Sequence, residues 1–118
     1  GTLQVIENIE DIRGNIINFP RCYILSNFQE NQRRGIHAHK KLYQLFLIFN
    51  GECIVKIYDG QDENSITLKQ GEGLFIVPGI WRELNEFSPG SLIVVLASEL
   101  YDINDYIFQK DEFLNYKS

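Results

Sequence analysis

The chain has 118 residues, the usual size of one domain, and 44% of them are hydrophobic, which is enough to form a core. Its formal net charge of −5 argues against a nucleic acid polymer as partner, because neutralising phosphates requires a basic face. The longest purely apolar run, residues 92–97, is far shorter than the ~18 residues of a membrane-spanning helix. We therefore expect one domain over residues 1–118, located in the cytoplasm, with neither nucleic acid nor membrane as a partner.

The cysteine content points to a reducing compartment. Cys22 and Cys53 are too few for a disulfide scaffold, and they lack the close spacing of a metal-binding or redox pair. Both lie in apolar segments that read as strands, so we expect two buried thiols without a chemical role.

Short apolar segments alternate with turn signals along most of the chain. In chain order, strands are predicted over residues 3–9, 16–19, 21–25, 42–49, 53–58, 65–68, 74–77, 80–84 and 91–98. Asn50-Gly51 is typical of a type I′ turn and predicts a β-hairpin between the strands on either side of it. This spacing of strands and turns predicts an all-β sandwich or barrel, with a short helix over residues 111–116.

Both histidines lie in one stretch, Arg33-Arg34-Gly35-Ile36-His37-Ala38-His39-Lys40-Lys41, together with four of the eleven Lys and Arg residues. Residues two apart on a strand point to the same face, so His37 and His39 are predicted to project together. Cationic side chains beside two imidazoles favour a small anion, such as a diphosphate, as ligand. The alternative interpretation is a solvated segment whose paired histidines bind nothing.

The spacing around the histidines is similar to that of the cupins, which are small jelly-roll-like β-barrels. After His39 come four residues, Gln44, six residues and Gly51, which fits the first cupin motif except that Gln44 replaces its glutamate. Gly73 and Pro78 echo the second motif one residue too close, and its histidine is absent. Since a metal site normally takes about three or four N or O donors, we expect neither a metal nor another cofactor here.

A longer resemblance covers residues 21–113. The matching blocks are Arg21-x-Tyr23, Arg34-Gly35-x-His37-Ala38-His39-Lys40-Lys41-x-x-Gln44, Gly73-Leu74-x-Ile76-x-Pro78-x-x-Trp81-Arg82, Phe87-Ser88, Val95-Leu96-Ala97-Ser98, Tyr101-Asp102 and Asp105-Tyr106-Ile107. In this order they resemble the cupin-fold dTDP-4-keto-6-deoxyhexose 3,4-ketoisomerases, which are grouped with the WxcM-like domains. One departure is Phe108, which stands where that family typically has arginine.

The resemblance implies a metal-independent 3,4-ketoisomerase. Such an enzyme converts a dTDP-linked 4-keto-6-deoxy sugar to the 3-keto sugar through an enediol, in the biosynthesis of deoxyamino sugars for surface glycans such as O-antigen or S-layer glycan. Histidine suits this chemistry because it can both accept and return a proton near neutral pH. His39 is the first choice for the base and His37 for its acid partner, although the sequence leaves the order of these two roles open. The resemblance also implies a homodimer, and the apolar residues 3–9 favour a partner surface.

The remaining site residues are expected to bind the substrate. Arg21 and Arg34 are candidates for contacts with the diphosphate or the enediolate, and Tyr23 for a hydrogen bond to a sugar oxygen. Gln44 is expected to orient a histidine or the sugar. Strict alternation favours Arg33 over Arg34 on the histidine face, but Gly35 can break the register, so we follow the motif and choose Arg34.

Trp81 has two interpretations, either stacking on the base or sugar of the substrate or packing as a core aromatic. Two other functions compete with the isomerase. One is a non-catalytic cupin that only binds a sugar nucleotide, and the other is a metal-dependent cupin enzyme. The sequence also leaves open the stereochemistry of the product at C4 and the glycan that is served.

Overall fold

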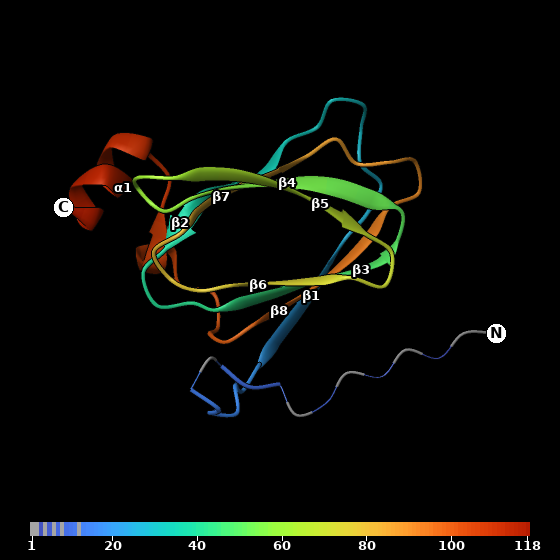
Figure 1. Ribbon diagram of the computed structural model, residues 1–118, viewed down its shortest axis with the longest axis horizontal. Coiled ribbons are helices and arrows are strands. Elements are labelled where there is room, and N and C mark those ends of the chain that lie inside the picture. The colour runs from blue at the N-terminus through green and yellow to red at the C-terminus, as the bar shows by residue number, and fades with distance from the viewer. Residues whose placement is uncertain (1–2, 4, 6, 8, 12) are drawn as a thin grey trace.

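The computed structural model describes residues 3, 5, 7, 9–11 and 13–118, and their strands form two antiparallel sheets that face each other (Figure 1). The four-stranded sheet has the order β1 (Arg21–Leu25), β8 (Leu92–Ala97), β3 (Gln44–Asn50) and β6 (Gly73–Ile76). The five-stranded sheet has the order β5 (Glu63–Lys69), β4 (Glu52–Tyr58), β7 (Trp81–Asn85), β2 (Arg34–His39) and β9 (Tyr106–Ile107). A 3₁₀-helix η1 (Ile103–Asp105) and the α-helix α1 (Lys110–Lys117) follow β8, with β9 between them.

The predicted all-β class is confirmed, and a jelly-roll-like arrangement of two packed sheets is compatible with every strand pairing. Among the described residues the two sheets do not close into one hydrogen-bonded barrel. The core lies between them because successive side chains on each strand alternate between the inner and outer faces. Its buried members are Phe46, Ile48, Cys53, Val55, Leu68, Ile76, Leu84, Ile93 and Val95.

The prediction of a hairpin at Asn50-Gly51 is wrong. The strands on either side of it belong to different sheets, since β3 pairs with β6 and β8 while β4 pairs with β5 and β7. Gly51 has φ +77°, but Asn50 is not among the described residues with positive φ, and a type I′ turn needs both. Gly51 thus lies where the chain crosses from one sheet to the other. A Cβ atom added at this position would lie 2.5 Å from Ser88 Oγ, so the crossing has no room for a side chain.

Helix α1 covers part of the outer face of the five-stranded sheet and is close to the predicted helix. Phe113 is fully buried, with its ring centroid 5.8 Å from that of Trp81 and 6.0 Å from that of Tyr58. Ala38 and Ile107, from the paired strands β2 and β9, complete this second small core. The helix therefore packs, through Phe113, against the outer face of β2, the strand that carries both histidines.

The segment before β1 differs from prediction. The strand expected over residues 3–9 includes residues 4, 6 and 8, which lie outside the described residues, and residues 3, 5, 7 and 9 are not in a strand. Over residues 16–19 only an isolated bridge forms, between Glu10 and Ile16. Cys53 is buried as expected, whereas Cys22 is exposed because alternation turns it to the outer face of β1.

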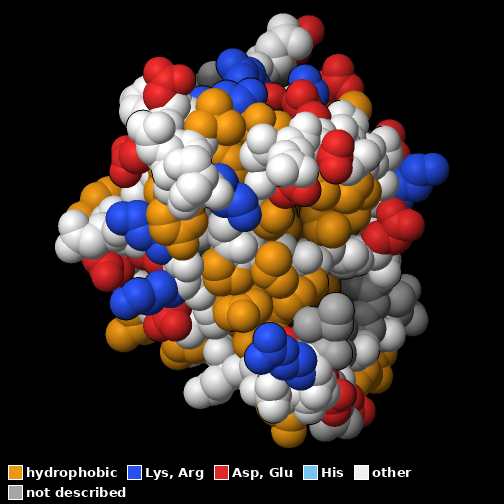
Figure 2. Space-filling model, turned by 60° about the vertical axis from the view of Figure 1, so that its left-hand side comes forward, with side chains coloured by type: hydrophobic (Ala, Val, Ile, Leu, Met, Phe, Trp, Pro, Cys, Tyr) orange, Lys and Arg blue, Asp and Glu red, His pale blue; other side chains and the backbone are white. Residues whose placement is uncertain are grey.

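Several large apolar side chains remain on the surface. Figure 2 shows a face on which hydrophobic side chains gather in the middle, with many of the charged side chains around them. Leu3, Val5 and Ile16 are 87%, 65% and 76% exposed, and Ile24 on β1 is 61% exposed. In the part of the chain that the structure describes, no helix has the length and hydropathy to cross a membrane.

Candidate active site

A bulge in β2 decides which cationic side chain joins the histidines. Gly35 has φ +64°, and the pairing of β2 with β7 shifts register between Arg34 and His37. The extra residue lets Arg34 and His37 face the same cavity although they are three positions apart. Arg33 points away instead and forms an ion pair with Glu83 on the outer side of the sheet.

His37 and His39 lie on one face of β2, as alternation predicts, and their rings meet edge to face with centroids 4.7 Å apart. His37 lines the cavity, while His39 is fully buried behind it. The Nδ1 atom of His39 lies 3.0 Å from Oδ2 of Asp105, and its Nε2 atom has no hydrogen-bond partner among the described residues. The two imidazoles therefore differ in environment, since His37 is open to the cavity and His39 has one nitrogen facing Asp105 and the other without a partner.

The surroundings of both histidines favour the neutral imidazole. Burial and then the positive charge of Arg82 lower the pKa of His37 to about 3. The same two causes lower the pKa of His39 to about 4, against the opposing effect of its hydrogen bond with Asp105. At neutral pH each ring thus keeps a free lone pair that can accept a proton.

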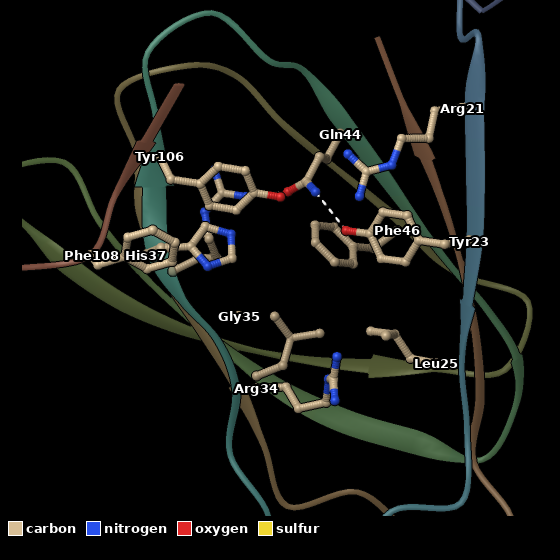
Figure 3. A pocket seen from close by; sticks show the side chains of 12 residues that line it. Arg21, Tyr23, Leu25, Arg34, Gly35, His37, Gln44, Phe46, Tyr106 and Phe108 are labelled. Carbon is tan, nitrogen blue, oxygen red and sulfur yellow. Dashed lines mark hydrogen bonds between the residues drawn. The ribbon is translucent and has the colours of Figure 1, made fainter. Parts of the chain in front are cut away.

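Arg82, Gln44 and Tyr23 form a connected polar group across the space between the two sheets. Arg82 is buried, and its guanidinium donates to the side-chain oxygen of Gln44 and, over 3.1 Å, to the carbonyl of Ile80. Gln44 donates in turn from Nε2 to the hydroxyl of Tyr23 at 2.7 Å (Figure 3). Because this hydroxyl accepts from Gln44, its own proton is left to donate to another group.

These residues surround a cavity of about 310 Å³, in the lower part of the range that binds small ligands. Figure 3 shows His37 and Tyr106 on one side of it, Tyr23 on the other, and Arg21 and Arg34 at opposite ends. The lining consists of polar and aromatic side chains with a few aliphatic ones: Arg21, Tyr23, Leu25, Arg34, Gly35, His37, Gln44, Phe46, Arg82, Leu84, Tyr106 and Phe108.

The charge of this lining is opposite to that of the whole chain. It holds the guanidinium groups of Arg21, Arg34 and Arg82, and no carboxylate is among its described members. Burial lowers the pKa of Arg82 to about 10, which still leaves it protonated at neutral pH. One nitrogen each of Arg21 and Arg82 is buried without a hydrogen-bond partner in the described structure. A ligand with negative charge would satisfy these donors and offset the cost of burying the cations.

A family model described as FdtA: WxcM-like, C-terminal matches residues 1–118. The chain belongs to this family. A protein of Aneurinibacillus thermoaerophilus named TDP-4-oxo-6-deoxy-alpha-D-glucose-3,4-oxoisomerase is 39% identical to this chain over 117 residues, which are 98% of this chain and 82% of the relative. The resemblance found in the sequence is thereby confirmed.

Solved structures agree with this relationship. A 3,4-ketoisomerase from Helicobacter canadensis is similar with a TM-score of 0.83 and 36% identity, over 92% of this chain and 83% of that one. A mutant of the 3,4-ketoisomerase QdtA from Thermoanaerobacterium thermosaccharolyticum, in complex with TDP-4-keto-6-deoxyglucose, has a TM-score of 0.84 and 33% identity, over 92% and 80% of the two chains. The cupin-like jelly roll is therefore the shared fold of this chain and these ketoisomerases.

The structure brings most of the residues predicted for the WxcM-like site together. Arg21, Tyr23, Arg34, His37 and Gln44 all line the cavity, and His39 lies directly behind this lining, with its ring against those of His37 and Tyr106. Gln44 hydrogen-bonds to Arg82 and Tyr23 in the described structure, and its expected role in orienting the sugar remains a prediction.

Trp81 is the predicted site residue that lies elsewhere. It occupies the face of β7 opposite to Arg82, where its ring packs on Phe113 of α1. It borders a separate hollow of about 260 Å³ on the outer side of the five-stranded sheet, together with Tyr58 and Lys110. This position supports the interpretation of Trp81 as a packed aromatic.

Sequence reasoning assigned no role to Arg82, Asp105, Tyr106 or Phe108. Arg82 is the one cation in the predicted strand over residues 80–84, and this is the signal that could have indicated its role. Tyr106 and Phe108 stack with centroids 5.2 Å apart, and both border the cavity beside His37. Phe108 thus presents an aromatic face where the family typically has arginine. Among the described residues, no group of three or more His, Cys, Asp or Glu side chains is arranged to hold a metal ion.

Proposed function

We propose that this protein is a sugar-nucleotide 3,4-ketoisomerase that acts on a TDP-linked 4-keto-6-deoxy sugar without a metal ion. The observation that carries the proposal is the combination of a cavity-lining neutral imidazole, His37, with three guanidinium groups around one cavity. The imidazole supports proton transfer at carbon, and the cations support binding of a diphosphate and of an enediolate. The oxoisomerase and ketoisomerases to which the chain is similar support the choice of substrate.

The proposed reaction moves protons and leaves the elemental formula of the sugar unchanged. The C4 carbonyl acidifies the hydrogen on C3, so a base can remove it to give an enediolate. A second proton passes from the oxygen on C3 to the oxygen on C4. Delivery of a proton to C4 then yields the 3-keto sugar and restores the base.

The geometry favours His37 as the base, in contrast to the first choice made from the sequence. His37 lines the cavity, whereas His39 is fully buried behind it. The lowered pKa of His37 means that its imidazole is neutral, and therefore has a lone pair free to accept a proton, before the substrate arrives. A bound diphosphate adds negative charge nearby, which would raise the pKa of the same imidazole and strengthen it as a base.

The other lining groups are proposed to stabilise charge and to bind. Arg82 is suited to the enediolate oxygen because its guanidinium is buried and has a nitrogen without a partner in the described structure. Arg21 and Arg34, nearer the ends of the cavity, are suited to the diphosphate. Tyr23 can donate its hydroxyl proton to a sugar oxygen, since Gln44 already occupies one acceptor position of that hydroxyl.

Proton NMR in heavy water tests the function directly. The protein is mixed with TDP-4-keto-6-deoxyglucose in the presence of a metal chelator. We expect the C3 proton signal to disappear and the signals of a 3-keto product to grow, since the base exchanges its proton with solvent. A parallel reaction in ordinary water delivers a proton to C4 instead, and the coupling of that proton to the C5 proton gives the stereochemistry of the product.

Two other results would each contradict part of the proposal. Broadened ligand signals without deuterium at C3 or C4 would mean that the cavity only binds the nucleotide sugar. Turnover that begins only when a divalent metal replaces the chelator would mean that the reaction depends on a metal.

We extend the proposal to the setting of the enzyme. A cytoplasmic location is supported by the free thiols of Cys22 and Cys53, which are typical of reducing compartments. The expected destination of the product is a deoxyamino sugar of a surface glycan, such as O-antigen or an S-layer glycan.

A homodimer is the oligomeric state that we propose, formed through the outer face of the four-stranded sheet. Alternation turns a set of apolar side chains to that face, all of them partly or fully exposed: Cys22, Ile24, Leu45, Leu47, Phe75, Val94 and Leu96. The described residues before β1 add exposed Leu3, Val5 and Ile16. Apolar surface of this extent is typical of an interface, and a second copy offers a matching one.

Replacing Ile24 by lysine is expected to shift the protein from dimer to monomer, because the charge would be buried in the proposed interface. Sedimentation equilibrium measures the change. Ile36→Lys is the matched control, since Ile36 is exposed on the outer face of the other sheet. A monomeric wild type, or an equal effect of both variants, would contradict this interface.

A further inference from the structure

Asp105 is a buried carboxylate that the proposed reaction does not yet use. It is 8% exposed and ends the 3₁₀-helix η1, whose N-terminus is capped by the side chain of Asp102 through the N–H of Asn104. Its Oδ1 atom accepts a hydrogen bond from the backbone N–H of Lys41 at 2.7 Å. Its Oδ2 atom lies 3.0 Å from Nδ1 of His39. One oxygen is thus fixed by the backbone and the other faces the imidazole.

The backbone around Asp105 is tied to the strand that carries His39. The N–H of Lys40 donates to the carbonyl of Asp105 at 3.0 Å, and His39 pairs with Tyr106 in the β2–β9 ladder. The carboxylate and the imidazole therefore belong to one rigid unit although they are 66 residues apart in the chain. This pairing keeps the carboxylate next to the imidazole, so Asp105 can determine which ring nitrogen of His39 carries the proton.

The hydrogen-bonding capacity of a carboxylate determines which nitrogen of His39 carries the proton. An ionised carboxylate only accepts, so the Nδ1 atom facing Asp105 must donate. In a neutral ring the proton then sits on Nδ1, and Nε2 keeps its lone pair. Nε2 is buried and has no hydrogen-bond partner among the described residues, so no protein group there competes for this lone pair.

We propose that Asp105 is a positioning residue that holds His39 in the Nδ1–H tautomer, so that Nε2 is the nitrogen that accepts and returns the proton moving between the oxygens on C3 and C4, while His37 removes the hydrogen on C3. This inference rests on the proposed function, because the isomerisation is what uses the proton. When Nε2 takes up a proton, the negative charge of Asp105 stabilises the resulting imidazolium against its burial. Asp105 thus acts on the substrate only through His39.

The Asp105→Asn variant reverses the tautomer with little change of shape. The Lys41 N–H continues to require an oxygen, so the amide NH₂ group turns to Nδ1 of His39. That nitrogen must then accept, and the ring proton moves to Nε2. We expect kcat to fall about a hundredfold or more, because the nitrogen that should accept the proton already carries one. Asp102→Asn is the matched control, since asparagine can cap η1 as aspartate does.

Nitrogen-15 NMR of the imidazole rings gives a readout that a purely structural role would not change. The chain has only two histidines, and spectra of the His37→Asn variant assign the signals of His39. In the wild type without substrate we expect a protonated Nδ1 and an unprotonated Nε2 on His39. In Asp105→Asn we expect the reverse, an unprotonated Nδ1 and a protonated Nε2, whereas Asp102→Asn should keep the wild-type pattern.

The wild-type spectrum tests the role of Asp105 even if the Asp105→Asn variant does not fold. An Nε2–H tautomer in an active wild type would overturn the role of Asp105 and leave the proposed function standing. An Nδ1–H tautomer in a wild type that exchanges no C3 proton would support the role in fixing the ring and overturn the isomerase. A switched tautomer with unchanged kcat in Asp105→Asn would also overturn the inference.

Discussion

The His37→Asn variant is expected to lose at least about a thousandfold in kcat while it keeps its fold and its affinity for TDP. A positioned general base contributes about 10²- to 10⁴-fold, and an amide cannot accept the C3 proton. Asparagine is polar and smaller, so the half-buried position on β2 can accommodate it. Loss of the C3 proton signal in heavy water measures the rate, and calorimetry measures the binding of TDP.

The pH dependence of stability supplies the control for this variant. The pKa of His37 is about 3 in the folded protein and near 6.5 in an unfolded chain, so the unfolded state binds more protons below pH 6.5. The free energy of unfolding should therefore fall as the pH decreases from 6.5 towards 3, and less steeply in His37→Asn. Turnover by the variant at the wild-type rate would contradict the role of His37 as the base. A pH dependence of unfolding identical to that of the wild type would contradict its lowered pKa in the folded protein.

Replacing Arg82 by methionine is expected to lower kcat about a hundredfold or more and to raise the free energy of unfolding. Removing one donor to a developing oxyanion costs about 10²- to 10³-fold in rate. The stability gain follows from burial, because this guanidinium is 1% exposed and its hydrogen bonds go to Gln44 and Ile80 rather than to a carboxylate. A buried cation that is not hydrogen-bonded to a carboxylate is costly, and a methionine of similar length avoids that cost.

Arg33→Met is the matched control and should show the opposite pattern. Arg33 pairs with Glu83 on the outer side of the five-stranded sheet, away from the cavity. Its loss leaves the largely buried carboxylate of Glu83 without its cation, so the free energy of unfolding should fall while kcat stays close to that of the wild type. Urea denaturation and the NMR assay measure both quantities. An Arg82→Met protein that is active, or that is destabilised as much as Arg33→Met, would refute the assignment of Arg82.

Local patterns in the sequence predicted the features that depend on neighbouring residues. Alternation placed His37 and His39 on one face, and Gly35 indicated the break in register that turns Arg34 towards them. Most strands from β1 to β8 and the C-terminal helix also followed from local composition, whereas the strands expected before β1 did not. These predictions succeed because the period of a strand and the freedom of glycine are properties of a few consecutive residues.

Features that depend on distant pairings could not be read in the same way. The hairpin predicted at Asn50-Gly51 fails because the two strands find their partners elsewhere in the chain, in different sheets. Asp105 reaches His39 only through the pairing of β9 with β2, which no local pattern indicates. Gln44 has the right position but different partners, since Arg82 and Tyr23 come from strands of both sheets.

The pairing of β1 with β8 has a consequence for how the cavity is made during synthesis. Arg21 and Tyr23 lie on β1, and among the described residues this strand joins its sheet through β8 alone, with Arg21 opposite Ala97. On a ribosome, β1 therefore waits without its partner until residues 92–97 have emerged, whereas β4 and β5 can pair as soon as they are made. Contacts between such distant residues close slowly, typically on a scale of about milliseconds to seconds in all-β domains. The cavity is thus among the last parts of this molecule to form, and its arginines remain hydrated until then.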